Sequence, residues 1–520
     1  MSGFALLLAL GCAPTVPPSG GDDDDGACEP GAGSCVQDGP ATSCRGDGSG
    51  YDEFLCDSKQ GLFCDFETGV CSGACSPEEL ARSYIGCEYR PTVTGNSVRS
   101  TFEFAVVVTN TSDLPADVVI EGGDLDAPIE LIVPPRSQRA QPLPWVADLK
   151  ACMGPCDDVP LSSSAVSDAG AYLLRSTRPV TVYQFSPLDY TQFGLFSYSN
   201  DASLLLPVNA LDREYVVASY PSWGDSPSQL SVTAVADDTE VTIVAAGNVR
   251  AGAQVPAIAA GETATFALDA GDVVQLFAEA REDLTGSVVT ASRDVQVIGG
   301  HYCTQIPHGP AACDHLEESM FPVRTLGTSY VVTQPAHPDF AEGKAGFTRI
   351  IAVDSDTHLV FSPPLPGVDT ELARRGDFVE VPLTLDSFHI EANHRVVVAQ
   401  YMQSQQAAGN TGDPAMTLAV PVEQYRAEYL FHAPTSYDYN YVNIVAPIEA
   451  DIVLDGEGLP SPDPIGDTGL GVIKARLGRG AEGDHHIAGS YPFGIAVYGY
   501  GSYTSYWYPG GLNLEPIQID

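Results

Sequence analysis

The chain has 520 residues, of which 44% are hydrophobic, with 51 Gly and 40 Pro. This is too apolar for a disordered chain, and the length leaves room for several domains rich in turns. Asp and Glu number 68 against 24 Lys and Arg, a formal charge of −44, so nucleic acid is not an expected partner because phosphate contacts need a basic surface. Carboxylates suit Ca²⁺, but the sequence holds no EF-hand loop and no Gly-Asp nonapeptide array, and no cofactor is predicted.

The first residues resemble a bacterial lipoprotein signal. A short apolar run from Phe4 to Leu10 leads to Gly11-Cys12, where signal cleavage would free Cys12 for acylation. The run is short and no Lys or Arg precedes it, so an accidental apolar N-terminus is the alternative. We expect residues 1–12 to be the signal and residues 13–27, which contain four consecutive Asp, to be a flexible linker. The protein would then be exported and lipid-anchored in the outer membrane or at the surface of a Gram-negative-type bacterium.

Residues 28–87 are predicted to form a small disulfide-linked module. The segment is rich in Gly and Asp, has little material for a core, and should fold only when cross-linked. Zinc is the alternative, but no CxxC pair occurs and export favours oxidation. The predicted disulfide partners are eight cysteines, whose pairing the sequence leaves open: Cys28, Cys35, Cys44, Cys56, Cys64, Cys71, Cys75 and Cys87.

Residues 84–511 carry a pattern that recurs about every 100 residues. An apolar strand with alternating Val is centred on Val180 and recurs at Val295, Val396 and Ile495. A second element, Pro-Val followed by an aromatic and β-branched strand, recurs three times, at Pro207, Pro322 and Pro421. The spacing predicts an all-β fold of about four tandem β-sandwich-like units, with a β-propeller as the alternative. The expected limits are 84–190, 202–302, 319–401 and 417–511.

Histidine and cysteine gather between His301 and His315. His301, Cys303, His308, Cys313 and His315 could ligate Zn²⁺ and support a metal-dependent hydrolase. In an exported chain a Cys303–Cys313 disulfide across a Pro-Gly loop is the simpler interpretation, and no metal or catalytic residue is then predicted. A second local disulfide is predicted between Cys152 and Cys156.

Aromatic residues crowd the C-terminal region. They could form a ligand-binding face or pack in the core of the last strand. The candidate face comprises Tyr500, Tyr503, Tyr506, Trp507 and Tyr508.

Several of these lines together resemble the IgGFc-binding protein N-terminal domain family. They are Gly300-His301-Tyr302-Cys303, Cys313-Asp314-His315-Leu316, the strand Tyr172–Phe185 and the line Ser199–Pro207. The resemblance covers about residues 84–511 and implies recognition of immunoglobulin Fc in a mucus or matrix setting. Because fold does not fix function, we expect a non-catalytic cell-surface binding or adhesion protein for an extracellular protein or glycan. A structural envelope or matrix component is the alternative.

Overall fold

The computed structural model describes residues 28–45, 48–77, 79–152, 163–192, 194–310, 312–407, 409–478 and 483–519. Cys12, the predicted linker 13–27 and Cys156 lie outside these ranges. The described residues divide into two compact bodies, and each is described by itself. No helix in these ranges is long and apolar enough to cross a membrane.

The smaller body holds most of the cysteine-rich module. Its disulfides are Cys28–Cys44, Cys35–Cys64 and Cys56–Cys71. Its strands are β1 (Gly33–Cys35), β2 (Pro40–Cys44), β3 (Tyr51–Leu55), β4 (Phe63–Asp65) and β5 (Val70–Ser72). The remaining pair, Cys75–Cys87, belongs to the larger body. The module predicted over 28–87 therefore divides between the two bodies.

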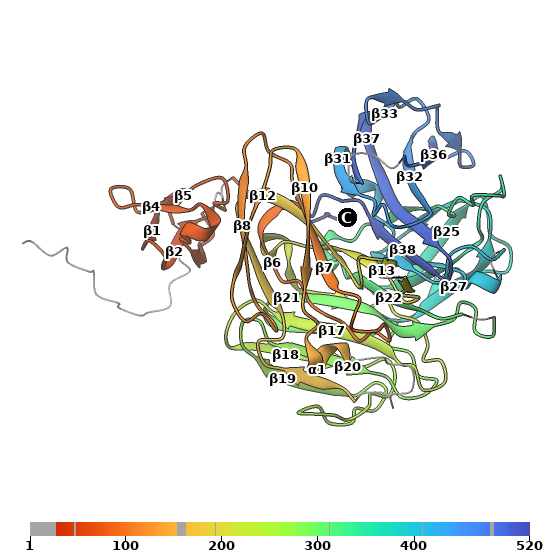
Figure 1. Cartoon of the computed structure of the whole chain (residues 1–520), viewed down its shortest axis with the longest axis horizontal. Coiled ribbons are helices and arrows are strands. Elements are labelled where there is room, and N and C mark those ends of the chain that lie inside the picture. Colours follow the sequence, from red (N-terminus) through yellow and green to blue (C-terminus); the bar gives the residue numbers. More distant parts are fainter. Residues whose placement is uncertain are drawn as a thin grey trace, which may run out of the picture. The chain divides into compact units, whose positions relative to one another are not determined.

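The larger body contains four β-units, coloured from orange to blue along the chain in Figure 1. The first has β6 (Gly86–Tyr89), β7 (Phe104–Asn110), β8 (Ala116–Gly122), β9 (Ile129–Val133), β10 (Ser137–Leu143), β12 (Tyr172–Phe185) and β15 (Ala202–Leu205). The second has β16 (Asp212–Val216), β17 (Ser228–Ala234), β18 (Thr239–Val244), β19 (Thr263–Leu268), β20 (Val273–Phe277), β21 (Val288–Thr304) and β22 (Asp314–Ser319). The third has β23 (Ser329–Val332), β24 (Gly346–Ala352), β25 (Thr357–Ser362), β26 (Glu371–Leu372), β27 (Phe378–Thr384), β28 (Phe388–Ala392), β29 (Val396–Met402) and β30 (Met416–Leu418). The fourth has β31 (Arg426–His432), β32 (Tyr439–Pro447), β33 (Ile452–Leu454), β34 (Glu457–Gly458), β35 (Asp463–Pro464), β36 (Leu470–Arg476), β37 (Asp484–Gly501) and β38 (Thr504–Pro509).

Strand pairing is the same in all four units. A long strand (β12, β21, β28 with β29, or β37) pairs through its first half with the first and third strands of the unit. Its second half pairs with the second and last strands. In the third unit the two halves form separate four-stranded sheets, with Tyr330, Ile350, Phe388 and Val398 buried in one shared core. Each unit is thus sandwich-like, as the sequence predicts, and is not a single propeller blade.

A buried tyrosine fastens the long strand in every unit. The Tyr330 hydroxyl accepts from Gly327 N at 3.1 Å and donates to Val396 O at 2.7 Å. Tyr89, Tyr215 and Tyr429 make the same pair of bonds in the other units. A buried carbonyl and amide are satisfied each time, at the point where the long strand passes from one half-sheet to the other.

The predicted unit limits are wrong at the last strand. β15 and β30 were expected to begin the second and fourth units, and Ser319 the third. Each instead pairs with the long strand before it: β15 with β12, β22 with β21 and β30 with β29. The Pro-Val element forms a short 3-10 turn between units, η2 (Val208–Ala210), η3 (Val323–Thr325) or η5 (Val422–Gln424), and the aromatic and β-branched strand predicted after it is present as β16, β23 and β31. Proline has no amide hydrogen for a strand ladder, which favours this turn.

Smaller elements complete the body. They are η1 (Ser58–Gln60), α1 (Ala147–Lys150), β11 (Ala165–Ser167), β13 (Thr191–Gln192), β14 (Leu195–Phe196) and η4 (Gln405–Ala407).

The C-terminal residues join separate units. Leu512 O accepts from Tyr84 N, and Leu514 N donates to Arg82 O, both before the first unit. Asn513 N donates to Gln424 O at the start of the fourth unit. Leu512 and Leu514 are fully buried, so this tail closes the first unit onto the last.

Candidate binding surface

The last strands of the four units meet at the centre of the larger body. β15 packs on β22, β22 on β30, β30 on β38, and β38 on β15. The Asp201 carboxylate, which immediately precedes β15, accepts hydrogen bonds from four backbone amides, one on each of these strands. The donors are Ala202 N at 2.9 Å, Glu317 N at 3.2 Å, Met416 N at 3.1 Å and Trp507 N at 3.2 Å.

Further carboxylates are buried around Asp201. Asp314 accepts from Asn200 N at 2.5 Å, His315 N at 2.9 Å and Ser505 N at 3.3 Å. Loss of solvation on burial raises the pKa of the Asp201, Asp314 and Glu318 carboxyls well above their ordinary values. The backbone donors act against this shift at Asp201 and Asp314. These side chains have no contact with solvent, so we assign them to the joint between units.

The loops above this joint lie at one end of the larger body. In each unit the start of the second strand pairs with the end of the long strand, for example Ser228 with His301 and Gly346 with Met402. The connection before the second strand and the connection after the long strand therefore share an end. We call this the loop end. It comprises the described residues of 90–103, 186–192, 194–201, 217–227, 305–310, 312–313, 333–345, 403–407, 409–415, 433–438 and 502–503.

Hydrogen bonds link the loop end across all four units. Ser404 N donates to Ile306 O at 2.8 Å, which connects the third unit to the second. Gly412 N donates to Gly501 O at 3.2 Å, and Tyr190 donates its hydroxyl hydrogen to Ser502 O at 2.9 Å. The loops therefore hold one another in place.

The cysteine-histidine stretch forms one of these loops. Cys303 and Cys313 are joined as a disulfide, the predicted pair. Buried His301 accepts from Cys303 N at its Nδ1 (3.1 Å), so its Nε2–H donates to Pro221 O (3.1 Å). Burial holds the pKa of His301 well below its ordinary value. The ring is neutral and both its nitrogens are used.

The three imidazoles have separate partners. His308 packs edge-on against Tyr220, with ring centroids 5.3 Å apart. His315 bonds to Thr94 Oγ1 at 3.2 Å and Glu317 Oε2 at 3.3 Å. Within the described ranges, no group of three or more His, Cys, Asp or Glu residues is arranged to hold a metal ion. The disulfide also removes the two thiolates from the ligand set that the zinc alternative required.

The predicted aromatic face is wrong for most of its members. Tyr500, Tyr506, Trp507 and Tyr508 are fully buried, because the second half of β37 lies between β32 and β38, and β38 packs on β15 and β30. Only Tyr503, at the tip of the turn between these strands, is exposed. An alternating stripe of aromatics marks a strand buried on both faces here.

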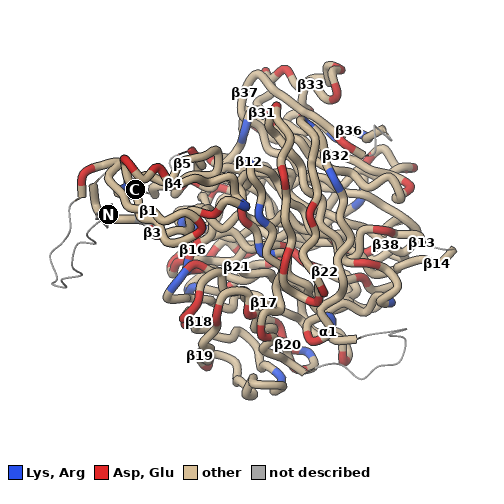
Figure 2. The backbone as a smooth tube through the Cα atoms, turned by 60° about the vertical axis from the view of Figure 1, so that its left-hand side comes forward, with Lys and Arg blue, Asp and Glu red and all other residues tan. Residues whose placement is uncertain are grey.

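An exposed apolar group surrounds Tyr503 instead. Phe196 stacks on Tyr198 at 5.5 Å, and Tyr198 meets Tyr503 edge-on at 6.0 Å. Their exposed fractions, with that of neighbouring Leu195, lie between 37% and 47%. We call Leu195, Phe196, Tyr198 and Tyr503 the aromatic loop surface. Figure 2 shows its hairpin, β13–β14, beside β38.

Phe196 and Tyr198 were not among the residues predicted to form a binding face. The sequence feature that could have revealed them is the dense apolar run Phe193-Gly-Leu-Phe-Ser-Tyr198, which lies in a turn-rich connection and not in a predicted strand. Of the predicted Cys152–Cys156 pair, Cys152 is buried, and the pair stays a prediction because Cys156 is outside the described ranges.

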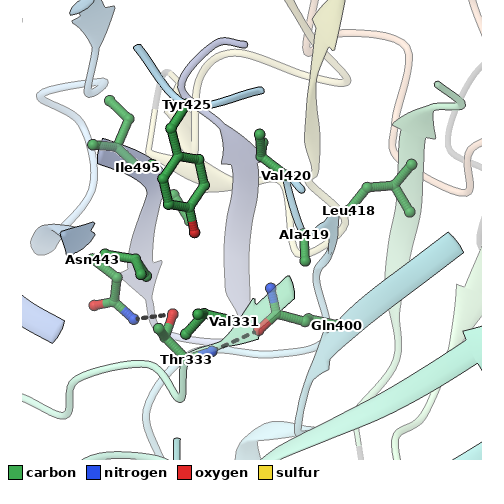
Figure 3. Close-up of a pocket in the computed structure, with 12 residues that line it drawn as sticks. Val331, Thr333, Gln400, Leu418, Ala419, Val420, Tyr425, Asn443 and Ile495 are labelled. Carbon is green, nitrogen blue, oxygen red and sulfur yellow. Dashed lines mark hydrogen bonds between the residues drawn. The ribbon is translucent and has the colours of Figure 1, made fainter. Parts of the chain in front are cut away.

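Two recesses lie between the third and fourth units. One cavity of about 30 Å³ lies between the third and fourth units and is shown in Figure 3. Thr333 N donates to Gln400 Oε1, and Asn443 donates to Thr333 Oγ1, across its floor. That volume suits a water molecule. The second, of about 330 Å³, lies between Pro363–Leu365 and Asp463–Gly466.

Comparisons with known proteins agree on one family. A family described as IgGFc binding protein matches residues 201–499. The IgGFc-binding protein of Homo sapiens is 34% identical over 133 residues, which is 25% of this chain and 2% of that protein. The chain thus spans only a small fraction of that relative. A solved tetra-tandem repeat from the extending region of a large adhesion protein is 11% identical and covers 82% of this chain and 99% of its own, with a TM-score of 0.09 that carries no argument.

Proposed function

The chain belongs to the IgGFc-binding protein family, and from that premise we propose that it is a non-catalytic, exported protein that binds an extracellular protein through the aromatic loop surface. The observation that carries the proposal is the exposure of Leu195, Phe196, Tyr198 and Tyr503 together at one place. Grouped exposed apolar side chains mark interaction sites more often than scattered ones do.

The aromatic loop surface is already ordered without a partner. Tyr190 packs behind this surface, with its ring centroid 5.3 Å from that of Phe196. Its hydroxyl donates to Ser502 O and accepts from Ser502 N. Tyr and Phe lose few rotamers when they bind, so preorganised aromatic groups supply contact area at low entropic cost.

The absence of catalysis is part of the proposal. The histidines that could serve as metal ligands or bases each have a structural partner, and Cys303 and Cys313 are oxidised. A reaction centre would need convergent groups around an accessible space. The two recesses between the third and fourth units are lined by none of these histidines.

Export and anchoring are proposed with the binding role. Several disulfides favour an oxidising compartment, and Cys12 would carry the lipid that retains the protein in the outer membrane or at the cell surface. Labelling with a radioactive fatty acid, in wild type and Cys12→Ser, tests the anchor. Equal labelling would remove it from the proposal.

An array of extracellular proteins and glycans tests the binding role. The array should include the Fc fragment of IgG, because that is the ligand in the human relative's name. We expect at least one protein ligand whose binding is lost in Phe196→Ser/Tyr198→Ser and kept in the control Tyr491→Ser/Ile448→Ser. The control residues are similarly exposed, at 45% and 44%, and lie in the fourth unit away from the loop end. A ligand held equally by both variants would overturn the assigned surface. An array without ligands would favour a structural envelope component.

A further inference from the structure

We infer that the aromatic loop surface recognises a cationic segment of its protein partner, with Lys or Arg side chains seated between the aromatic rings and two flanking carboxylates, Asp189 and Asp438. This inference rests on the proposed function and names the chemistry of the partner. It starts from the arrangement of charge around the rings.

Both carboxylates are neighbours of the ring cluster. Asp189 directly precedes Tyr190, and Asp438 directly follows Tyr437. The rings of Tyr190 and Tyr437 lie 6.0 Å apart. Asp438 is also fixed by its backbone, since its amide donates to Tyr500 O at 3.0 Å. Burial raises the pKa of the Tyr190 and Tyr437 hydroxyls, and the charges of Asp438 and Asp189 respectively add to this shift, so each carboxylate lies near one of these two rings.

Neither carboxylate has an ion-pair partner among the described residues. The surrounding protein partly desolvates Asp189 and raises the pKa of its carboxyl. A cation from a partner would relieve that cost and would also interact with the ring faces. A phosphate or an acidic glycan would instead be repelled.

The rest of the loop end carries the same sign. Its exposed charged residues are one cation, Arg99, and six acids: Glu103, Asp189, Asp225, Asp339, Glu342 and Asp438. The formal sum, 1 − 6, is −5. Lys344 belongs to the same loops but is buried, with Nζ bonded to Thr411 O at 3.1 Å and lying over the Tyr500 ring. No exposed lysine is therefore present in the described loop end to satisfy the carboxylates from within.

Long-range attraction of a basic peptide to this strongly acidic protein must be distinguished from binding at one site. Figure 2 shows acidic residues spread over many elements, so any basic peptide will be drawn weakly to the whole surface. Control substitutions that remove the same charge elsewhere make the distinction. Asp117 and Asp451 are exposed and lie on or beside third strands, which pair with the first half of the long strand, away from the loop end.

The test uses two labelled 15-residue peptides, one with five Lys separated by Gly-Ser and one with Gln at those five positions, and measures anisotropy at low and moderate salt. We expect the Lys peptide alone to bind. Asp189→Asn/Asp438→Asn should weaken it about fivefold and Phe196→Ser/Tyr198→Ser at least as much, while Asp117→Asn/Asp451→Asn changes it less than twofold.

Two results would overturn the inference: equal weakening by both charge variants, or equal binding of the Gln peptide. If array ligands still depend on Phe196 and Tyr198 in either case, the proposed function stands without the cationic partner. If the ligands found on the array bind Phe196→Ser/Tyr198→Ser as tightly as wild type, the proposed function itself fails.

Discussion

Asp201 accepts a hydrogen bond from the backbone amide of Trp507 at 3.2 Å, across 306 positions of the chain. The same carboxylate accepts amides from the second and third units. One side chain in the first unit therefore completes the hydrogen bonding of all four last strands.

We expect Asp201→Asn to lower the free energy of unfolding by at least about 3 kcal/mol. The amide group of Asn has one acceptor oxygen in place of two, so buried backbone donors lose their partner, each at a cost of about 1–3 kcal/mol. Chemical denaturation measures the change. Asp117→Asn, at an exposed position, should shift stability by no more than about 0.5 kcal/mol. Similar values for the two variants would contradict the assigned role.

The buried tyrosine that bonds the long strand in each unit leads to a second prediction. Tyr330→Phe removes a hydroxyl that bonds both Gly327 N and Val396 O, so it should cost about 1–3 kcal/mol with little change in volume. The same substitution at exposed Tyr491 is the control. Thermal unfolding of the two variants would show whether the hydroxyl, and not the ring alone, holds the long strand. Equal melting temperatures would count against this.

Sequence recurrence could predict the four units, because Val180, Val295 and Val396 occupy the same place in a buried long strand, and Phe493, two residues before Ile495, occupies it in the fourth unit. It could not place the unit limits. β15 and the Pro207 turn are adjacent in sequence, and only the pairing of Leu205 with Val182 shows that the strand closes the preceding unit. The cysteine loop could be predicted from local spacing and compartment. Phe196, Tyr198 and Tyr503 could not, because two loops 300 positions apart become neighbours only when the units form a closed ring.

The contribution of His301 to stability should fall as pH decreases below about 6.5, whereas the raised pKa of the buried Asp201, Asp314 and Glu318 carboxyls contributes in the opposite direction. Burial keeps His301 neutral in the folded protein, whereas in the unfolded chain the imidazole gains a proton near its ordinary pKa. The unfolded state then binds more protons, so the contribution of His301 is complete above that pKa and is lost as pH falls, by up to about 1.4 kcal/mol per pH unit. Burial also lowers the pKa of His308, which adds in the same direction.

Denaturation at pH 7.5, 6.5 and 5.5 measures this dependence. The slope of unfolding free energy against pH should be less positive in His301→Gln than in wild type, while His394→Gln, on a partly exposed turn, should keep the wild-type slope. Parallel slopes for wild type and His301→Gln would refute the assignment.

The Cys303–Cys313 disulfide should stabilise the loop end locally. Closing a loop with a sequence separation of 10 contributes about 2–3 kcal/mol through the unfolded chain. We expect Cys303→Ala/Cys313→Ala to lose that amount and to increase hydrogen exchange in residues 305–313. Unchanged exchange there would mean that the bonds from Ser404 and Gly412 suffice to hold the loops.

The hydrogen bond between Asp201 and Trp507 also delays completion of the fold during synthesis, because the chain between the two residues must be made first. At about 5–20 residues per second, 306 residues take roughly 15–60 s. Over that interval the first unit exists with its carboxylate still hydrated and the inner face of β15 without β38. A nascent chain must therefore be kept from aggregating until its last strand emerges, and a fragment that stops before β38 inherits that exposed state permanently.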